Sequence, residues 1–142
     1  MTRVEFFFNV EDKLQKIAEL SESVVSKGRR LMLFSADTQL LARVEDYLWS
    51  HPPTGFTPHC RCNHALAAVT PIVIDSHGDR LAHDDVLINL QDKHPPFFSR
   101  FRRLIEIVGL DEADKSAARE RYRFYRDRGY EIKSFDVSGA AI

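Results

Sequence analysis

The 142-residue sequence has little of several features that define common classes of protein. Its two cysteines, Cys60 and Cys62, are two positions apart and do not form the disulfide framework of a small secreted protein. No apolar run approaches the roughly 20 residues that a membrane-spanning helix needs. The N-terminus also lacks the apolar stretch and cleavage site of a signal peptide. We therefore expect a cytoplasmic protein that makes no contact with a membrane.

An excess of one charge is also missing, because 20 Lys and Arg face 21 Asp and Glu and give a formal charge of −1. Proteins that coat nucleic acid usually have a large basic excess, so we expect no direct binding to nucleic acid by the surface as a whole. The composition, 44% hydrophobic and 29% charged, is that of an ordinary globular protein. Its length predicts one domain over residues 1–142.

Glycine is scarce at the positions where nucleotide-binding folds need it. The sequence contains no Gly-x-Gly and no Gly-Lys-Ser/Thr, and the junction after the first apolar run reads Phe8-Asn9-Val10-Glu11-Asp12. Without glycine the backbone cannot approach phosphate closely, so we predict no phosphate-binding loop and no cofactor. No nucleophile elbow or His-Glu-x-x-His helix occurs either, and we expect no catalytic residues and no enzyme activity.

Apolar runs and helical periods alternate along the chain. The runs predict strands over residues 3–8, 30–34, 71–74, 86–90, 104–108 and 130–137. The 3.6-residue period predicts helices over 12–27, from about 37 to 49 and over 111–128, with a short aromatic helix after Pro95 and Pro96. Residues 51–68 are expected to be mostly loop, with one short strand at most. This alternation predicts an α/β fold: a single three-layer domain with a mostly parallel sheet.

The segment Pro58-His59-Cys60-Arg61-Cys62-Asn63-His64 is the one most suggestive of metal. Two thiolates and two imidazoles are the ligands that zinc prefers. However, the Cys-x-Cys spacing forces a tight chelate, whereas structural zinc sites usually take two separated pairs of ligands. We therefore favour a polar loop and predict no metal site.

The helix predicted over 111–128 has acids at its start and bases at its end, which complements the helix dipole. Near its end two adjoining faces form, with Ala118, Tyr122 and Tyr125 on one and Arg119, Arg123 and Arg126 on the other. Arginines beside tyrosines suit acidic groups that are joined to an apolar side chain. A solvated face neutralised by Glu120 and Asp127 is the alternative. Five arginines after Ala118 outnumber those two acids, which favours a binding surface.

A second cluster, Trp49-Ser50-His51-Pro52-Pro53-Thr54-Gly55-Phe56, follows the second predicted helix. Its aromatic side chains could close the core, or they could be exposed anchors for a protein partner. The residues alone favour neither.

Five segments in order carry a family resemblance: Phe6-Phe7-Phe8, Leu48-Trp49-x-x-Pro52-x-x-x-Phe56-x-Pro58-His59, Val86-Leu87-Ile88-Asn89-Leu90, Phe101-x-x-Leu104-Ile105-Glu106-Ile107-Val108 and Ala118-Arg119-Glu120-Arg121-Tyr122-Arg123-x-Tyr125-Arg126-x-x-Gly129-Tyr130. Together they resemble the chi subunits of bacterial DNA polymerase III. The resemblance implies a nucleotide-binding-like fold without a working nucleotide site. It also implies a non-enzymatic adaptor that binds the psi subunit, which links it to the clamp loader. Its second partner would be single-stranded DNA-binding protein, whose acidic C-terminal tail ends in Phe after aspartates.

Carried over by position, the resemblance places the tail-binding site on Arg119, Tyr122 and Arg123 and the psi-binding patch on Trp49, Pro52 and Phe56. Position 123 is Arg where the family pattern leads us to expect Lys, so the charge is kept but the contact geometry changes. We add Arg126 to the tail site from its helical spacing. Direct binding of single-stranded nucleic acid through the Arg119–Arg128 helix is the alternative function.

Overall fold

The computed structural model describes residues 2–50, 59–61, 70–78, 81 and 83–136. In these ranges the strands are β1 (Arg3–Val10), β2 (Leu31–Phe34), β3 (His59–Arg61), β4 (Ile72–Asp75), β5 (Val86–Asn89), β6 (Arg103–Gly109) and β7 (Ile132–Phe135). The helices are α1 (Lys13–Ser26), α2 (Thr38–Ser50) and α3 (Glu112–Asp127), with one 3-10 turn, η1 (Phe98–Arg100).

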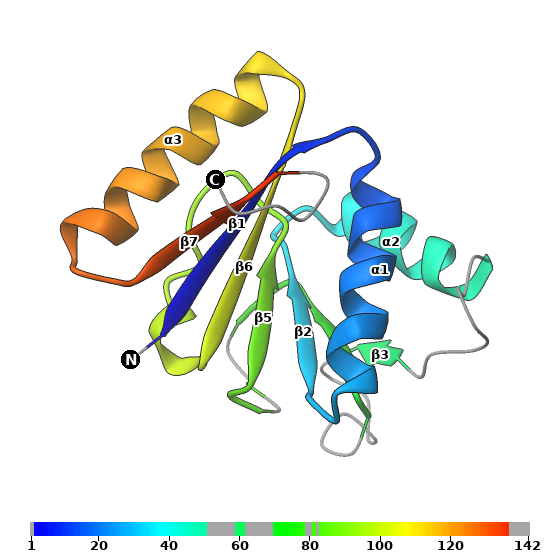
Figure 1. Cartoon of the computed structure of the whole chain (residues 1–142). Helices are drawn as coiled ribbons and strands as arrows, with labels where there is room; N and C mark the ends of the chain where they lie inside the picture. The colour runs from blue at the N-terminus through cyan, green and yellow to red at the C-terminus, as the bar shows by residue number, and fades with distance from the viewer. Residues whose placement is uncertain (1, 51–58, 62–69, 79–80, 82, 137–142) are drawn as a thin grey trace.

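The strands form one seven-stranded sheet in the order β3-β4-β2-β5-β6-β1-β7, and every neighbouring pair is parallel (Figure 1). Because the strands are parallel, their carboxyl ends share one edge of the sheet and their amino ends share the other. From β1 the chain crosses through α1 to β2, and from β6 it crosses through α3 to β7, on the far side of β1. The predicted α/β fold with a parallel sheet is confirmed.

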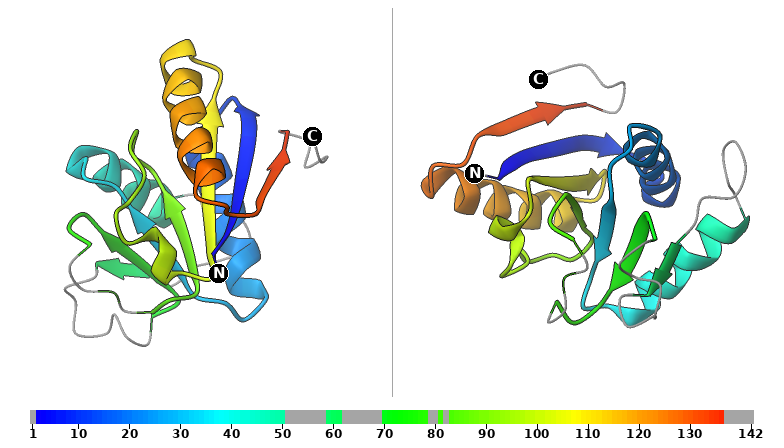
Figure 2. Two further views of the ribbon diagram at one scale, coloured as in Figure 1. Left: turned by 90° about the vertical axis from the view of Figure 1, so that its left-hand side faces the viewer. Right: turned by 90° about the horizontal axis from the view of Figure 1, so that it is seen from below.

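Both faces of the sheet are buried at its centre, which explains why β2 is apolar throughout and why β4 and β5 are apolar over their first three residues. Leu31 and Leu33 face α1 and α2, whereas Met32 and Phe34 face α3 and η1. Figure 2 shows α3 on the face of the sheet opposite to α1 and α2. The molecule therefore has the three layers that the alternating sequence pattern predicts.

Three elements differ from their predicted form by more than one residue at an end. The aromatic helix expected after Pro95 and Pro96 is one 3-10 turn, because Phe98 and Phe101 are both buried and β6 begins two residues beyond. The first strand continues to Val10 through an irregularity at Asn9, whose φ of 61° is one that asparagine tolerates. The last strand is shorter than expected, at Ile132–Phe135. Among the described helices, none is both long and apolar enough to cross a bilayer.

Candidate functional site

The helix with the predicted site, α3, is attached to the sheet by one buried carboxylate. Glu106 of β6 is fully buried and accepts hydrogen bonds from Arg121 Nε at 3.0 Å and from the Tyr125 hydroxyl at 2.6 Å. The Asn89 side-chain amide donates to both of its oxygens, at 3.2 and 3.1 Å. Because Arg121 and Tyr125 are one helical turn apart, this carboxylate fixes both the rotation and the height of α3 on the sheet.

The surroundings of the Glu106–Tyr125 contact keep the Tyr125 hydroxyl protonated. Burial and the neighbouring Glu106 carboxylate raise the pKa of Tyr125, so its hydroxyl remains a donor. Burial also raises the pKa of Glu106, an effect that the Arg121 guanidinium and the donated hydrogen bonds oppose. Arg121 itself is 4% exposed. One of the five arginines that made the helix look strongly basic in the sequence is therefore a core residue.

One flank of α3 is covered by the segment between β5 and η1. The Arg121 Nη1 donates to the Asp92 carbonyl at 2.7 Å, and the His94 ring stacks on Phe124 with centroids 3.6 Å apart. The guanidinium of Arg128 also lies over the Phe124 ring, at 3.5 Å from its centroid. A second arginine is thus engaged in packing on this side.

The opposite flank of α3 carries a row of side chains that we call the α3 stripe: Lys115, Arg119, Tyr122, Arg123 and Arg126. Their spacing of i, i+4, i+7, i+8 and i+11 places them along one side of a helix. Arg119 and Arg123 are exposed, and neither forms an ion pair with any described residue. Arg126 pairs only with the exposed neighbouring Asp127, at 3.3 Å. The structure thus groups all four predicted tail-site residues on one flank of the helix.

Lys115 belongs to this row but was absent from the predicted site. The signal that identifies it is its position four residues before Arg119, which places both side chains on the same side of the helix. Sequence reasoning stopped at the aromatic part of the helix, so it missed the basic residue one turn closer to the N-terminus.

Tyr122 lies between the exposed arginines and the core. Its ring is half-buried, with its centroid 5.3 Å from that of Phe6 in β1. Phe8 and Ile132 are also half-buried and pack against the same apolar cluster. The arrangement combines two exposed arginines, which form no ion pair with a described residue, with an apolar margin, as a ligand with both acidic and aromatic groups requires.

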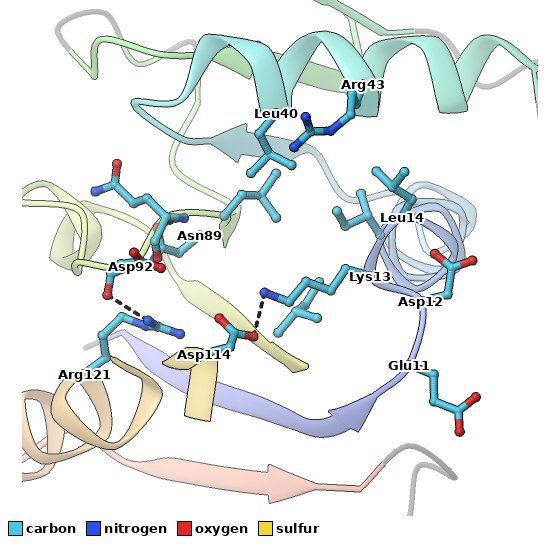
Figure 3. Close-up of a pocket in the computed structure, with 14 residues that line it drawn as sticks. Glu11, Asp12, Lys13, Leu14, Leu40, Arg43, Asn89, Asp92, Asp114 and Arg121 are labelled. Atoms are coloured by element: carbon cyan, nitrogen blue, oxygen red, sulfur yellow. Dashed lines mark hydrogen bonds and ion pairs between the residues drawn. The ribbon is translucent and has the colours of Figure 1, made fainter. Parts of the chain in front are cut away.

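A cavity of about 540 Å³ lies at the carboxyl ends of the strands (Figure 3), the position where open α/β folds commonly bind ligands. Lys13 Nζ points into it and pairs with Asp114 at 2.6 Å, and Arg121 reaches Asp92 on the opposite wall. Leu14 and Leu40 supply apolar lining.

Carboxylates occupy the helix N-termini beside this cavity. Asp12 accepts from the Gln15 amide and caps α1, and Asp111 accepts from the Ala113 amide and caps α3. In nucleotide-binding folds these amides hold phosphate. Here acidic side chains occupy them and would repel an anion.

The remaining sequence predictions lie largely outside the described residues. Trp49 belongs to α2, but its side chain is not described, and Pro52 and Phe56 lie outside the described ranges. Cys62 and His64 do too, whereas the backbone of Cys60 is part of β3. Within the described ranges, no three His, Cys, Asp or Glu side chains gather as a metal site would require. The psi-binding and metal predictions therefore stay predictions.

The fold and this site define a parallel three-layer α/β protein in which carboxylates cap the N-termini of α1 and α3. The family model for the DNA polymerase III chi subunit, HolC, matches residues 1–133, so the chain belongs to the chi subunit family. Similar relatives named DNA polymerase III subunit chi come from Pseudomonas aeruginosa, 31% identical over 137 residues, and Haemophilus influenzae, 33% identical over 119 residues. The first alignment covers 94% of this chain and 95% of the relative, and the second covers 83% of each.

The contact of Glu106 with Arg121 and Tyr125 predicts that substitutions of different arginines in α3 change the free energy of unfolding by very different amounts. Arg121→Ala leaves the Glu106 carboxylate buried without its cation, and we expect the free energy of unfolding to fall by about 3–5 kcal/mol. Arg119→Ala removes an exposed side chain that forms no ion pair with a described residue, and it should change the free energy of unfolding by about 0.5 kcal/mol or less. Urea unfolding followed by circular dichroism measures both. Equal effects of the two substitutions would contradict the role assigned to the Arg121–Glu106 contact.

The ion pair in the cavity predicts a pH-dependent contribution to stability. Burial alone would raise the pKa of Asp114, but Lys13 and the Gly109 amide hydrogen-bond to its carboxylate and lower the pKa below the usual 3.8. Asp114→Asn should therefore reduce the free energy of unfolding by about 1 kcal/mol at pH 7. The difference should disappear as the pH falls from 3.8 through the folded-state pKa. Denaturant titrations at several pH values test this, and a difference that persists at pH 2 would be contrary to it.

Proposed function

We propose that this chain is a non-catalytic adaptor of DNA polymerase III, acting in the cytoplasm. One surface would bind the psi subunit, which leads to the clamp loader, and another would bind the acidic C-terminal tail of single-stranded DNA-binding protein. Family membership supports the first part. The observation that carries the second part is the α3 stripe, where exposed arginines without ion pairs to described residues flank a half-buried tyrosine.

In this proposal the two chemical halves of the tail meet two halves of the site. The forked guanidiniums of Arg119 and Arg123 suit the tail's aspartates and terminal carboxylate. Tyr122 would lie beside the terminal Phe ring, where Phe8 and Ile132 add apolar surface. Lys115 and Arg126 would extend the basic surface along the remaining acidic residues of the tail. Each member of the α3 stripe then has a role that follows from its position.

Exposure of these charges sets the expected strength of binding. Since Arg119 and Arg123 are solvated in the free protein, their pairing with the tail gains modest energy, and added salt screens it. We expect fast association and an affinity that falls as ionic strength rises.

The psi-binding patch is proposed on Trp49, Pro52 and Phe56. Trp and Phe next to prolines form an apolar anchor of the kind that carries much of the energy in protein interfaces. Trp49 is the second-last residue of α2, whereas the α3 stripe belongs to the helix on the other face of the sheet. Two partners could then bind at once, as a bridge requires.

The alternative function, single-stranded nucleic-acid binding along the Arg119–Arg128 helix, has less support from the side chains. Of the five arginines in this range, Arg121 is buried against Glu106, and the exposed Arg128 lies over Phe124, on the flank opposite to the α3 stripe. The basic surface available to a phosphate backbone on α3 is correspondingly smaller than the sequence indicates.

A charge reversal in the α3 stripe should weaken tail binding. We expect Arg123→Glu to reduce the affinity for a peptide with the C-terminal sequence of single-stranded DNA-binding protein at least tenfold, because it replaces attraction by repulsion. Calorimetric titration measures this. Arg128→Glu is the matched control, with the same charge change on the covered flank of the same helix, and should alter affinity less than threefold. Unchanged binding by Arg123→Glu would exclude the site.

Substitutions in the aromatic patch should have the opposite selectivity. We expect Trp49→Ala or Phe56→Ala to lower psi affinity by about 2 kcal/mol or more, because a buried aromatic anchor is lost. Binding of the tail peptide should stay within a factor of two. Co-purification with psi and peptide titration, done on the same preparations, separate the two effects. Loss of tail binding with psi binding intact would reverse the assignment.

A further inference from the structure

The amino ends of the strands form a second basic surface, at the edge of the sheet opposite to the cavity of Figure 3. A concavity of about 550 Å³ is lined there by five cations, which we call the amino-end patch: Arg3, Lys27, Arg29, Arg102 and Arg103. They come from the start of β1, the turn between α1 and β2, and the start of β6. Residues far apart in sequence are gathered by the parallel sheet, so no basic motif announces this surface in the sequence.

Charge at the amino-end patch differs in sign from that of the whole chain. Asp85 and Glu131 also line the concavity, and Glu5 lies between Arg3 and Arg103. Five cations against three carboxylates leave a local excess of two positive charges, in a protein of formal charge −1. Lys27 and Arg102 are exposed and form no ion pair with a described residue. The formal charge of the whole chain therefore does not exclude binding of nucleic acid at this edge of the sheet.

Glu5 holds two of these guanidiniums in place. Its nearly buried carboxylate accepts from Arg103 Nε and Nη2 at 3.0 and 2.7 Å and from Arg3 Nε at 3.1 Å. Those bonds use only part of each guanidinium, since Arg103 Nη1 and both terminal nitrogens of Arg3 have no such bond to Glu5. A fixed guanidinium with N–H groups that form no hydrogen bond to a described residue is suited to phosphate oxygens.

The amino-end patch differs from the α3 stripe in how little apolar surface accompanies its cations. Among the described residues that line the concavity, Val86 is the sole apolar side chain and none is aromatic. A peptide tail ending in Phe would find no wall for its ring, and a base would find no ring on which to stack. The ligand that these side chains fit is a chain of anions contacted through its charges alone, which describes a phosphodiester backbone.

We propose that the amino-end patch binds the phosphate backbone of single-stranded DNA, weakly and without preference for sequence. DNA is the polymer on which a subunit of DNA polymerase III operates, and contact through phosphates alone carries no sequence information. Such binding would hold the protein on DNA through a surface distinct from the one proposed for the protein tail. It does not depend on the tail-binding proposal, because the two sets of residues do not overlap.

The test is fluorescence anisotropy of a labelled oligo-dT of about 20 nucleotides, titrated with the full chain at low salt and along a salt series. The Lys27→Ala, Arg102→Ala double variant removes two cations without breaking an ion pair to a described residue. We expect at least a tenfold loss of affinity and a salt slope that is smaller in magnitude by about 1.4, from about 0.7 for each lost phosphate contact.

The matched control is Arg119→Ala, Arg123→Ala, which removes the same charge from the α3 stripe and should keep DNA affinity within threefold. A polyglutamate of similar length is the second probe and should bind far more weakly than the oligonucleotide. Three results would overturn the proposal: no DNA binding by the unaltered protein at low salt, loss in the α3 variant but not in the amino-end variant, or polyglutamate binding as tight as that of DNA.

Discussion

The contact between Glu106 and α3 determines the geometry on which the proposed tail site depends. A carboxylate in the middle of a buried strand is costly unless donors surround it, and Arg121, Tyr125 and Asn89 supply them here. Because two of those donors are one turn apart on α3, the helix has one rotation on the sheet. That rotation turns Arg119 and Arg123 to solvent and Tyr122 toward Phe6. A buried polar contact thereby specifies an exposed surface.

The same fold explains why the ends of the sheet differ. At the carboxyl ends, Asp12 and Asp111 cap their helices, so the amides that bind phosphate in related folds are occupied. At the amino ends, cations from separate elements surround Glu5 and leave a local positive excess. Both proposed anion sites therefore lie away from the position where this architecture usually binds anions.

Much of the fold could be predicted from the sequence because periodicity is local. The runs at 31–34 and 86–88 are apolar on both faces, which indicates a parallel buried sheet, and Tyr122 and Arg123 fall on the predicted faces of α3. Arg121 could not be distinguished from its neighbours, because its partner Glu106 is 15 residues away and the pairing arises only when α3 packs on β6. The amino-end patch was unpredictable for the same reason, since strand order decides which basic residues meet.

The most direct test of the tail site is a map of where the tail peptide binds the intact protein. Amide chemical shifts of the isotope-labelled chain should be followed by NMR as the peptide is added. If the tail binds the α3 stripe, the largest changes will lie along α3 from Lys115 to Arg126 and on the neighbouring part of β1 around Phe8, with little change at the cavity of Figure 3 or at the amino-end patch. Changes centred on Leu90–Asp92 or on Arg102 and Arg103, with α3 unaffected, would contradict it.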